Sequence, residues 1–515
     1  MASKGISFMN LFLLLLALSL SWIEFSDAQT PTNQNISIFS RKSFPKDFTF
    51  GAASAAYQYE GASTEDERGP SIWDTFSQNY PNKIADHTTG NVTNDFYHRY
   101  KEDIQLMKSL GLDSFRLSIS WSRVIPSGKL SKGVNKAGIA FYNNVINELL
   151  ANGITPFVTI FHWDLPQPLE DEYGGFLSSR IVDDYVDFSE LCFKEFGDRV
   201  KHWTTFNEPL TFTAAGYDSG ILAPGRCSSW RNNDCPAGNS ATEPYLVAHN
   251  ILLSHGAIVD LYRKKYKPSQ NGEIGIVLNP TWYVPYTSNK ADKQAARRAL
   301  EFAYGWFLDP LVHGDYPPTM RRLVGRRLPK FTAEQSKLVK GSLDYLGVNY
   351  YSASFAAHLP SRNRLGANIS YTTDSQTNLT TIRKGLTIGE AEGVSGLFVY
   401  PQGLREILVY TKNKYNNPKL YVTENGYGDR NVSNVEEAIK DLGRARFYEG
   451  HLKAIKQAID EGVKVKGFFP WSFMDMWEWN SGFAQNYGLI FVDRKNGLKR
   501  HLKTSALWYK KFLNA

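Results

Sequence analysis

Eight apolar runs of strand length recur along the chain, and amphipathic segments separate them. Several of these runs are continuously apolar and β-branched, which is typical of parallel strands that are buried on both faces. The runs cover residues 48–58, 114–121, 155–164, 202–209, 273–280, 344–351, 419–426 and 465–475. Strands that alternate with helices eight times predict an α/β fold, a single (β/α)8 TIM barrel.

Helix-like stretches with an apolar stripe lie between the predicted strands. They cover residues 100–110, 139–150, 181–196, 244–266 and 435–459. Two long polar segments, residues 224–242 and 359–392, interrupt this alternation. Long loops of a barrel often carry function, so we expect these two insertions at the C-terminal face, where they would shape the entrance to a site.

Two of the predicted strands end in a glutamate. The stretch HWTTFNEP brings Glu208 to the end of the fourth run, and LYVTENG brings Glu424 to the end of the seventh. The carboxyl ends of barrel strands carry the chemistry, and a buried charge is costly unless it is paired or used. A structural ion pair would explain either glutamate alone, but the two together favour catalysis.

Glycoside hydrolysis needs such a pair of carboxyl groups. One must stay protonated to assist the leaving oxygen, and the other must stay ionised beside the anomeric carbon. Arg116 is a cation in an otherwise apolar strand, and it could hold one of the carboxylates in its ionised form.

The motifs TFNEP (205–209) and YVTENG (421–426) resemble the acid/base and nucleophile motifs of glycoside hydrolase family 1. The resemblance runs from FPKDFTFGAASAAYQYEGA, which begins at Phe44, to the end of the chain, and it includes FHWDLPQPLEDEYGGF and WSFMDMWEWNSGF. It is strongest for plant secreted β-glucosidases that act on specialised-metabolite glucosides. It implies a retaining mechanism in which Glu424 is the nucleophile and Glu208 is the acid/base.

The resemblance also implies a sugar site. A sugar ring has polar edges and apolar faces, so such a site needs hydrogen-bonding groups around an aromatic platform. Tyr487 stands where many members have Phe, which adds a hydroxyl near the 6-position of the sugar. The other implied residues are Gln58, His162, Glu478 and Trp479 for the glycone hydroxyls, Trp471 as the aromatic floor, Asn207 for the 2-hydroxyl, and Tyr351, Arg116 and Asn349 for the charge and orientation of the nucleophile.

The aglycone side departs from the family pattern. Many plant members carry a Trp shortly before the YPQG segment, and Gly396 stands at that place here. Loss of an indole would widen the slot, so we expect a bulky or non-planar aglycone. Glu208 stands where myrosinase-type relatives carry Gln, which favours O-glucosides over glucosinolates.

Two alternative functions remain. The first is a diglycosidase or transglucosidase that uses the same glutamates. The second is a non-catalytic carbohydrate-binding homologue, against which the presence of both Glu208 and Glu424 argues.

Composition and charge limit the partners that we expect. Hydrophobic residues make up 42% and charged residues 21% of the 515 residues, which is typical of a globular protein with a large core. The net charge of +7 is spread along the chain without a long basic run, so no nucleic-acid partner is expected. Since metal-ligand spacing and a glycine-rich phosphate loop are absent, we expect no metal and no cofactor. A homo-oligomer remains open.

The first residues read as a targeting segment. Residues 1–28 have a basic start, an apolar run at 12–20 and a small-x-small site that ends at Ala28, which predicts a secretory signal peptide. The apolar run is too short to span a bilayer. A polar leader at 29–45 and the (β/α)8 catalytic domain at 46–515 follow. We therefore expect a protein of the secretory pathway, extracellular (apoplastic) or vacuolar, without a membrane partner.

Cysteines and sequons fit this route. Cys227 and Cys235 lie close together in a polar segment and could close a small loop as a disulfide. Cys192 lies in a helix-like pattern and is expected to be a buried free thiol. N-glycosylation sequons occur at Asn35, Asn91, Asn368, Asn378 and Asn431.

Overall fold

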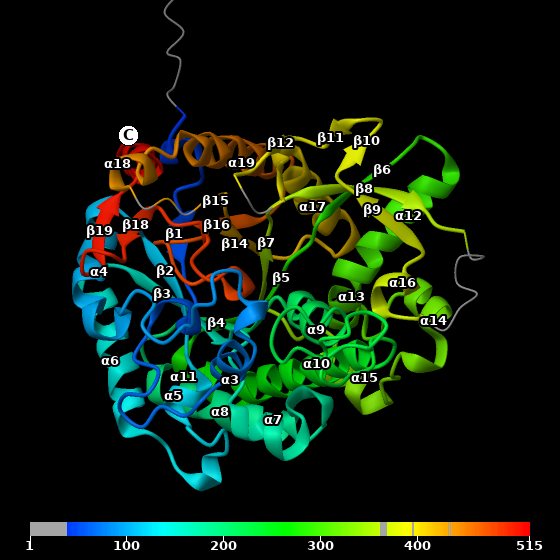
Figure 1. The fold of residues 1–515 in the computed structure, drawn as a ribbon, viewed down its shortest axis with the longest axis horizontal. Helices are drawn as coiled ribbons and strands as arrows, with labels where there is room; N and C mark the ends of the chain where they lie inside the picture. Colours follow the sequence, from blue (N-terminus) through cyan, green and yellow to red (C-terminus); the bar gives the residue numbers. More distant parts are fainter. Residues whose placement is uncertain (1–38, 361–367, 394–395, 431, 433) are drawn as a thin grey trace, which may run out of the picture. The chain divides into compact units, whose positions relative to one another are not determined.

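A closed barrel of eight parallel strands forms the centre of the unit Ser40–Ala515 (Figure 1). The computed structural model describes residues 39–360, 368–393, 396–430, 432 and 434–515. All eight predicted strands are present and pair in chain order, and β1 closes the ring against β16. They are β1 (Thr49–Ala53), β2 (Ser114–Ser118), β3 (Thr155–Phe161), β4 (His202–Asn207), β5 (Glu273–Leu278), β7 (Tyr345–Asn349), β14 (Leu420–Asn425) and β16 (Val465–Pro470). The predicted TIM barrel is confirmed.

The strands are buried along nearly their whole length. Every residue of β2, β7 and β14 is buried. Helices surround the barrel (Figure 1), so both faces of each strand are covered, the inner face by the other strands and the outer face by helices. This explains why the strands are continuously apolar in sequence. The first predicted strand was too long, because the chain leaves β1 at Ala53 and turns into the short helix α2 (Ala56–Tyr59).

Four of the five predicted helices are confirmed, with shifts of a few residues at their ends. They are α4 (Phe96–Leu110), α6 (Lys136–Ala151), α8 (Ile181–Phe196) and α10 (Glu243–Leu261). A π-helical turn, η5 (Tyr262–Tyr266), continues α10 to the predicted end.

The fifth predicted helix was wrong, because the stretch forms two helices, α18 (Val435–Ala438) and α19 (Leu442–Asp460). At the break, the chain forms hydrogen bonds with the first residues of the last helix, α20 (Thr504–Asn514). The side chain of Asp441 accepts hydrogen bonds from the backbone N–H and the hydroxyl of Ser505, at 2.7 and 2.5 Å. The N–H of Thr504 donates to the carbonyl of Ile439 at 2.8 Å. The backbone carbonyl of Ile439 thus bonds a distant segment at the place where the helix is interrupted.

The described residues of the two insertions form local structure. The first contains the disulfide Cys227–Cys235, as predicted, while Cys192 is a buried free thiol on α8. The second contains α16 (Tyr371–Asp374) and β9 (Thr377–Thr380), which pairs with β8 (Ala353–His358).

Several N-terminal and surface predictions fall outside the described residues. These are the signal peptide, most of the leader, Asn35 and Asn431. Asn91, Asn368 and Asn378 are exposed, and their glycosylation stays a prediction. Within the described part of the chain, no helix is long and apolar enough to cross a bilayer, and no group of three or more His, Cys, Asp or Glu could hold a metal ion.

Candidate active site

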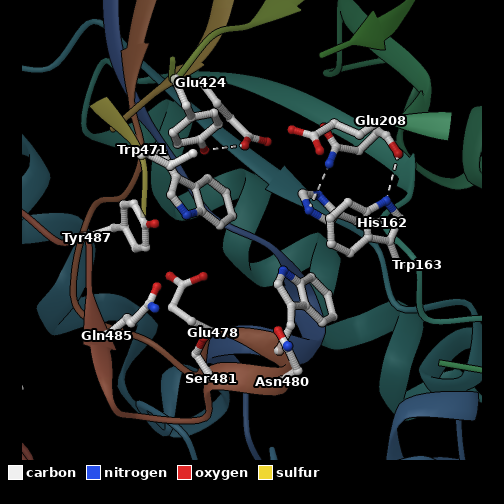
Figure 2. A pocket seen from close by; sticks show the side chains of 14 residues that line it. His162, Trp163, Glu208, Glu424, Trp471, Glu478, Asn480, Ser481, Gln485 and Tyr487 are labelled. Atoms are coloured by element: carbon white, nitrogen blue, oxygen red, sulfur yellow. Dashed lines mark hydrogen bonds between the residues drawn. The ribbon is translucent and has the colours of Figure 1, made fainter. Parts of the chain in front are cut away.

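A cavity of about 230 Å³ opens where several barrel strands end at their carboxyl side (Figure 2). Nine residues that the sequence singled out line it: His162, Asn207, Glu208, Tyr351, Glu424, Trp471, Glu478, Trp479 and Tyr487. They come from chain positions more than 300 residues apart, and the closed barrel brings them together. Both glutamates therefore line one cavity, as the sequence predicted.

Glu424 is paired with a cation. Arg116, on β2, places Nη1 2.5 Å from Oε1 of Glu424, and the hydroxyl of Tyr351 donates to Oε2 at 2.8 Å. Both members of the ion pair are almost fully buried. Burial raises the pKa of Glu424, and the neighbouring guanidinium opposes that rise because it favours the charged form.

Among the described residues, Glu208 contacts no cation and is held by neutral donors. Its backbone lies in the left-handed region, at φ 44°, between the end of β4 and the start of α9 (Pro209–Tyr217). Asn349 Nδ2 donates to Oε1 at 2.7 Å, and Thr211 Oγ1 donates to Oε2 at 2.8 Å. Burial, and then the charge of Glu424, raise the pKa of Glu208 to about 8. The two glutamates therefore have different electrostatic surroundings in one cavity.

A hydrogen-bond network connects these two surroundings through Asn207. Its Oδ1 accepts from Arg116 Nη2 at 2.7 Å and from Asn349 Nδ2 at 3.0 Å. Asn349 therefore contacts Glu208 and Asn207, and its proximity lowers the pKa of both glutamates. The resemblance had linked Asn349 to the nucleophile alone.

The imidazole of His162 is neutral and fixed in one tautomer. Burial and the charge of Arg116 lower its pKa well below the usual value. Asn207 Oδ1 already accepts two bonds, so Nδ2 of Asn207 donates to His162 Nε2 at 3.0 Å. The imidazole proton then lies on Nδ1, which has no partner among the described residues and can donate to a ligand hydroxyl.

Gln58 does not line the cavity but supports a residue that does. Its Nε2 donates to Glu478 Oε2 and to the carbonyl of Trp477, both at 2.9 Å. Glu478 Oε1 is buried and has no hydrogen-bond partner in the described structure, so it is available as an acceptor.

Aromatic rings form the walls of the cavity. The indole of Trp479 lies 4.7 Å from that of Trp163 between centroids, and His162 stacks beside Trp471 at 5.8 Å. Figure 2 shows the Tyr487 ring, with its hydroxyl, on the same side as Gln485. Flat apolar faces with polar edges nearby suit a sugar ring.

Sequence reasoning missed five lining residues. Trp163, Asn480 and Ser481 lie inside the quoted motifs, so their position next to named residues was the available signal. Gln485 lies in the two-residue strand β17 (Gln485–Asn486), which is too short to show a pattern in the sequence. Leu397 lies in a loop, and its position next to Gly396 was the available signal.

The aglycone side differs from the expectation in one respect. Gly396 is exposed, and its neighbour Leu397 is the residue that lines the cavity. A Cβ on Gly396 would meet no atom within 4 Å, but its φ of +69° disfavours any other residue. None of the described lining residues belongs to either insertion, so the insertions do not form the wall of this cavity as far as it is described.

Comparison with known proteins agrees with this geometry. The family model described as glycosyl hydrolase family 1 matches residues 40–515. Furcatin hydrolase of Viburnum furcatum is 58% identical over 470 residues, which cover 91% of this chain and 86% of the relative. Beta-glucosidase 12 of Oryza sativa subsp. indica is 54% identical, over 92% and 93% of the two chains.

Solved structures match over most of both chains. The crystal structure of the rice Os3BGlu6 β-glucosidase superimposes with a TM-score of 0.91 at 47% identity, and the match covers 93% of this chain and all of that one. A β-glucosidase of the fungus Humicola insolens in complex with glucose gives a TM-score of 0.88 at 41% identity, over 92% and 98% of the two chains. The chain therefore belongs to glycosyl hydrolase family 1.

Proposed function

We propose that the protein is a retaining β-glucosidase that hydrolyses the β-O-glucosidic bond of plant specialised-metabolite glucosides and releases glucose and the aglycone. One observation carries this proposal. Two buried glutamates share a cavity, but Glu424 is paired with Arg116 and Glu208 is not. This asymmetry suits a reaction that needs one ionised and one protonated carboxyl group.

In the first half of the reaction, Glu424 attacks the anomeric carbon and forms a covalent glycosyl-enzyme. Arg116 and Tyr351 hold its two oxygens and favour the charged, nucleophilic form. Glu208 gives its proton to the departing oxygen, so the aglycone leaves as an alcohol.

In the second half, the ionised Glu208 takes a proton from water, and the oxygen of that water attacks the anomeric carbon. The bond to Glu424 breaks, and glucose leaves with retained configuration. Each turnover restores both carboxyl groups to their starting forms.

The glycone would be held by groups that are ready to bond hydroxyls. His162 Nδ1 offers a donor and Glu478 Oε1 an acceptor, each without a partner among the described residues. Trp471 and Trp479 offer ring faces in the same cavity.

The aglycone is proposed to be bulky or non-planar. No indole stands at Gly396, and the side chain that reaches the cavity there is the aliphatic Leu397. The similarity to a furcatin hydrolase supports a specialised-metabolite glycoside as the class of substrate.

The experiment is a comparison of kcat/KM for flat aryl β-glucosides and for bulky terpenoid or alkaloid β-glucosides. We expect the bulky glucosides to be preferred, and Leu397→Trp to shift the preference toward the flat ones by on the order of tenfold, which corresponds to about 1.4 kcal/mol. A strong preference of the unchanged protein for flat aglycones would contradict the proposed substrate, while hydrolysis itself would still support the enzyme.

A diglycosidase is the second candidate, and one observation favours it. The cavity wall near Glu478 also contains the polar side chains of Asn480, Ser481 and Gln485 (Figure 2). These groups could bond a second sugar attached to the glucose. Incubation with a disaccharide glycoside would distinguish the two, since release of the intact disaccharide indicates a diglycosidase.

Arg116→Met should move the acidic limb of the kcat/KM profile to higher pH. Without the guanidinium, only the hydrogen bonds from Tyr351 and Asn349 oppose the effect of burial on Glu424, so its pKa rises and a higher pH is needed to ionise it. We expect kcat/KM at mildly acidic pH to fall by on the order of 10²-fold. Arg123→Met removes the buried partner of Glu60 outside the cavity and serves as the control for stability. An unchanged acidic limb in Arg116→Met would contradict the assignment.

The disulfide Cys227–Cys235 supports a route through an oxidising compartment. With the predicted signal peptide, this leads us to propose a protein of the secretory pathway, in the apoplast or the vacuole.

A further inference from the structure

Thr211 lies three residues after Glu208, in the first turn of α9. The helix turns there so that Thr211 Oγ1 donates to Glu208 Oε2 at 2.8 Å. Asn349, at the end of β7, donates to the other oxygen at 2.7 Å. Donors from two separate elements therefore hold both oxygens and fix the plane of the carboxyl group.

Asn279 fixes the direction of the Thr211 hydroxyl. It directly follows β5, and its Nδ2 donates to Thr211 Oγ1 at 2.7 Å. A hydroxyl has a single hydrogen, and the bond from Asn279 uses Thr211 as an acceptor. The hydrogen of Thr211 is then free for Glu208, so the chain of bonds runs in one direction, and each bond strengthens the next.

We propose that Thr211, oriented by Asn279, is a positioning residue that holds the Glu208 carboxyl and favours its charged form. The inference rests on the proposed function, since it matters only if Glu208 gives and takes a proton in each turnover. Thr211 is not among the residues that line the cavity, so it acts through Glu208.

The balance of forces at Glu208 explains why such a residue is useful. Burial and the charge of Glu424 raise its pKa, and the hydrogen bonds from Asn349 and Thr211 oppose that rise. A carboxyl group held too firmly in its protonated form would give its proton to the departing oxygen less readily. Hydrogen-bond donors to the carboxylate lower the pKa of Glu208 without a cation next to it.

The test is the pH dependence of kcat/KM with p-nitrophenyl β-glucoside. Thr211→Val keeps the shape but removes the donor, so we expect the alkaline limb to move up by about one pH unit, roughly the loss of one hydrogen bond to a charged group. Thr211→Ser keeps the hydroxyl and should restore the wild-type limb. Asn279→Asp puts an acceptor beside Thr211, draws its hydrogen away from Glu208, and should move the limb in the same direction as Thr211→Val.

Thr213→Val is the matched control. Thr213 is buried on the same helix, and its hydroxyl donates to the carbonyl of Pro209 at 2.8 Å without contacting Glu208. It should leave the alkaline limb in place, and its thermal stability measures the cost of losing a threonine hydroxyl from α9.

The outcomes separate the inference from the function on which it rests. If wild type hydrolyses the substrate and Glu208→Gln loses the alkaline limb, the proposed function holds. If the profiles of Thr211→Val and Asn279→Asp then coincide with that of wild type, the inference is overturned. If Thr211→Val does not fold, Asn279→Asp alone decides it by the same criterion. If wild type does not hydrolyse any β-glucoside, both fail.

Discussion

Glu424→Ala is expected to lower kcat for β-glucoside hydrolysis by on the order of 10⁴-fold or more, because the variant cannot form the glycosyl-enzyme. The expectation rests on the position of this carboxylate. It lies in the cavity, buried, with Oε1 on Arg116 and Oε2 on Tyr351. No other described carboxylate in the cavity is paired with a cation in this way. The measurement is the initial rate with p-nitrophenyl β-glucoside at saturating substrate.

Rescue by a small anion makes the result specific. Truncation to alanine leaves space beside Arg116, and azide bound there would attack the anomeric carbon from the face that Glu424 used. With an activated glucoside, the product should be α-glucosyl azide, of inverted configuration. Activity within tenfold of wild type, or a β-configured azide, would contradict the role of Glu424 as the nucleophile.

Stability needs a separate control, because the substitution leaves Arg116 buried and unpaired. Removal of one partner of a buried ion pair typically costs about 3–5 kcal/mol. The double variant Glu424→Ala with Arg116→Met removes both charges. If it melts close to wild type and stays inactive, then the loss of activity comes from the missing nucleophile and not from unfolding.

The barrel could be predicted because its strands carry a simple physical signature. Strands buried on both faces must be apolar at every position, so each was visible as a continuous run. The same burial makes a charge at a strand end stand out, which is why Glu208 and Glu424 could be identified from the sequence. Their convergence then follows from closing a parallel barrel, whose strands all end at one face.

The parts that escaped prediction depend on contacts between distant segments. At the break before α19, Asp441 bonds Ser505, which lies 64 residues further along the chain. The local pattern of apolar residues does not indicate such a contact. The support of Glu208 by Asn349 joins residues 141 positions apart. Leu397 reaches the cavity from a loop and Gln485 from the two-residue strand β17, and both are placed by tertiary packing and not by a repeating pattern. The sequence therefore predicted most residues that line the cavity, both glutamates among them, but not Leu397 and Gln485.

Glu208→Gln should produce a loss that depends on the aglycone. For glucosides whose aglycone is a weakly acidic alcohol, kcat/KM should fall by about 10²–10⁴-fold, since departure of the alkoxide then has no proton donor. For 2,4-dinitrophenyl β-glucoside the fall in kcat/KM should be much smaller, because that leaving group is stable as an anion. The measurement is kcat/KM for a series of glucosides with leaving groups of increasing acidity. A uniform loss across the series would contradict the role of Glu208 as the acid.

The pH profile tests the same residue independently. In wild type, Glu208 must be protonated for the first half of the reaction, and burial beside Glu424 raises its pKa to about 8. Activity on weakly acidic aglycones should therefore be lost as pH rises through that region, while glutamine cannot titrate and should remove this alkaline limb. The amide can still accept a bond from Thr211, so the fold near α9 should be retained.

Added azide gives a further test of Glu208→Gln, because in this variant the nucleophile is intact and only the base is missing. Azide should attack the glycosyl-enzyme from its open side and yield β-glucosyl azide. This configuration is opposite to that expected for Glu424→Ala.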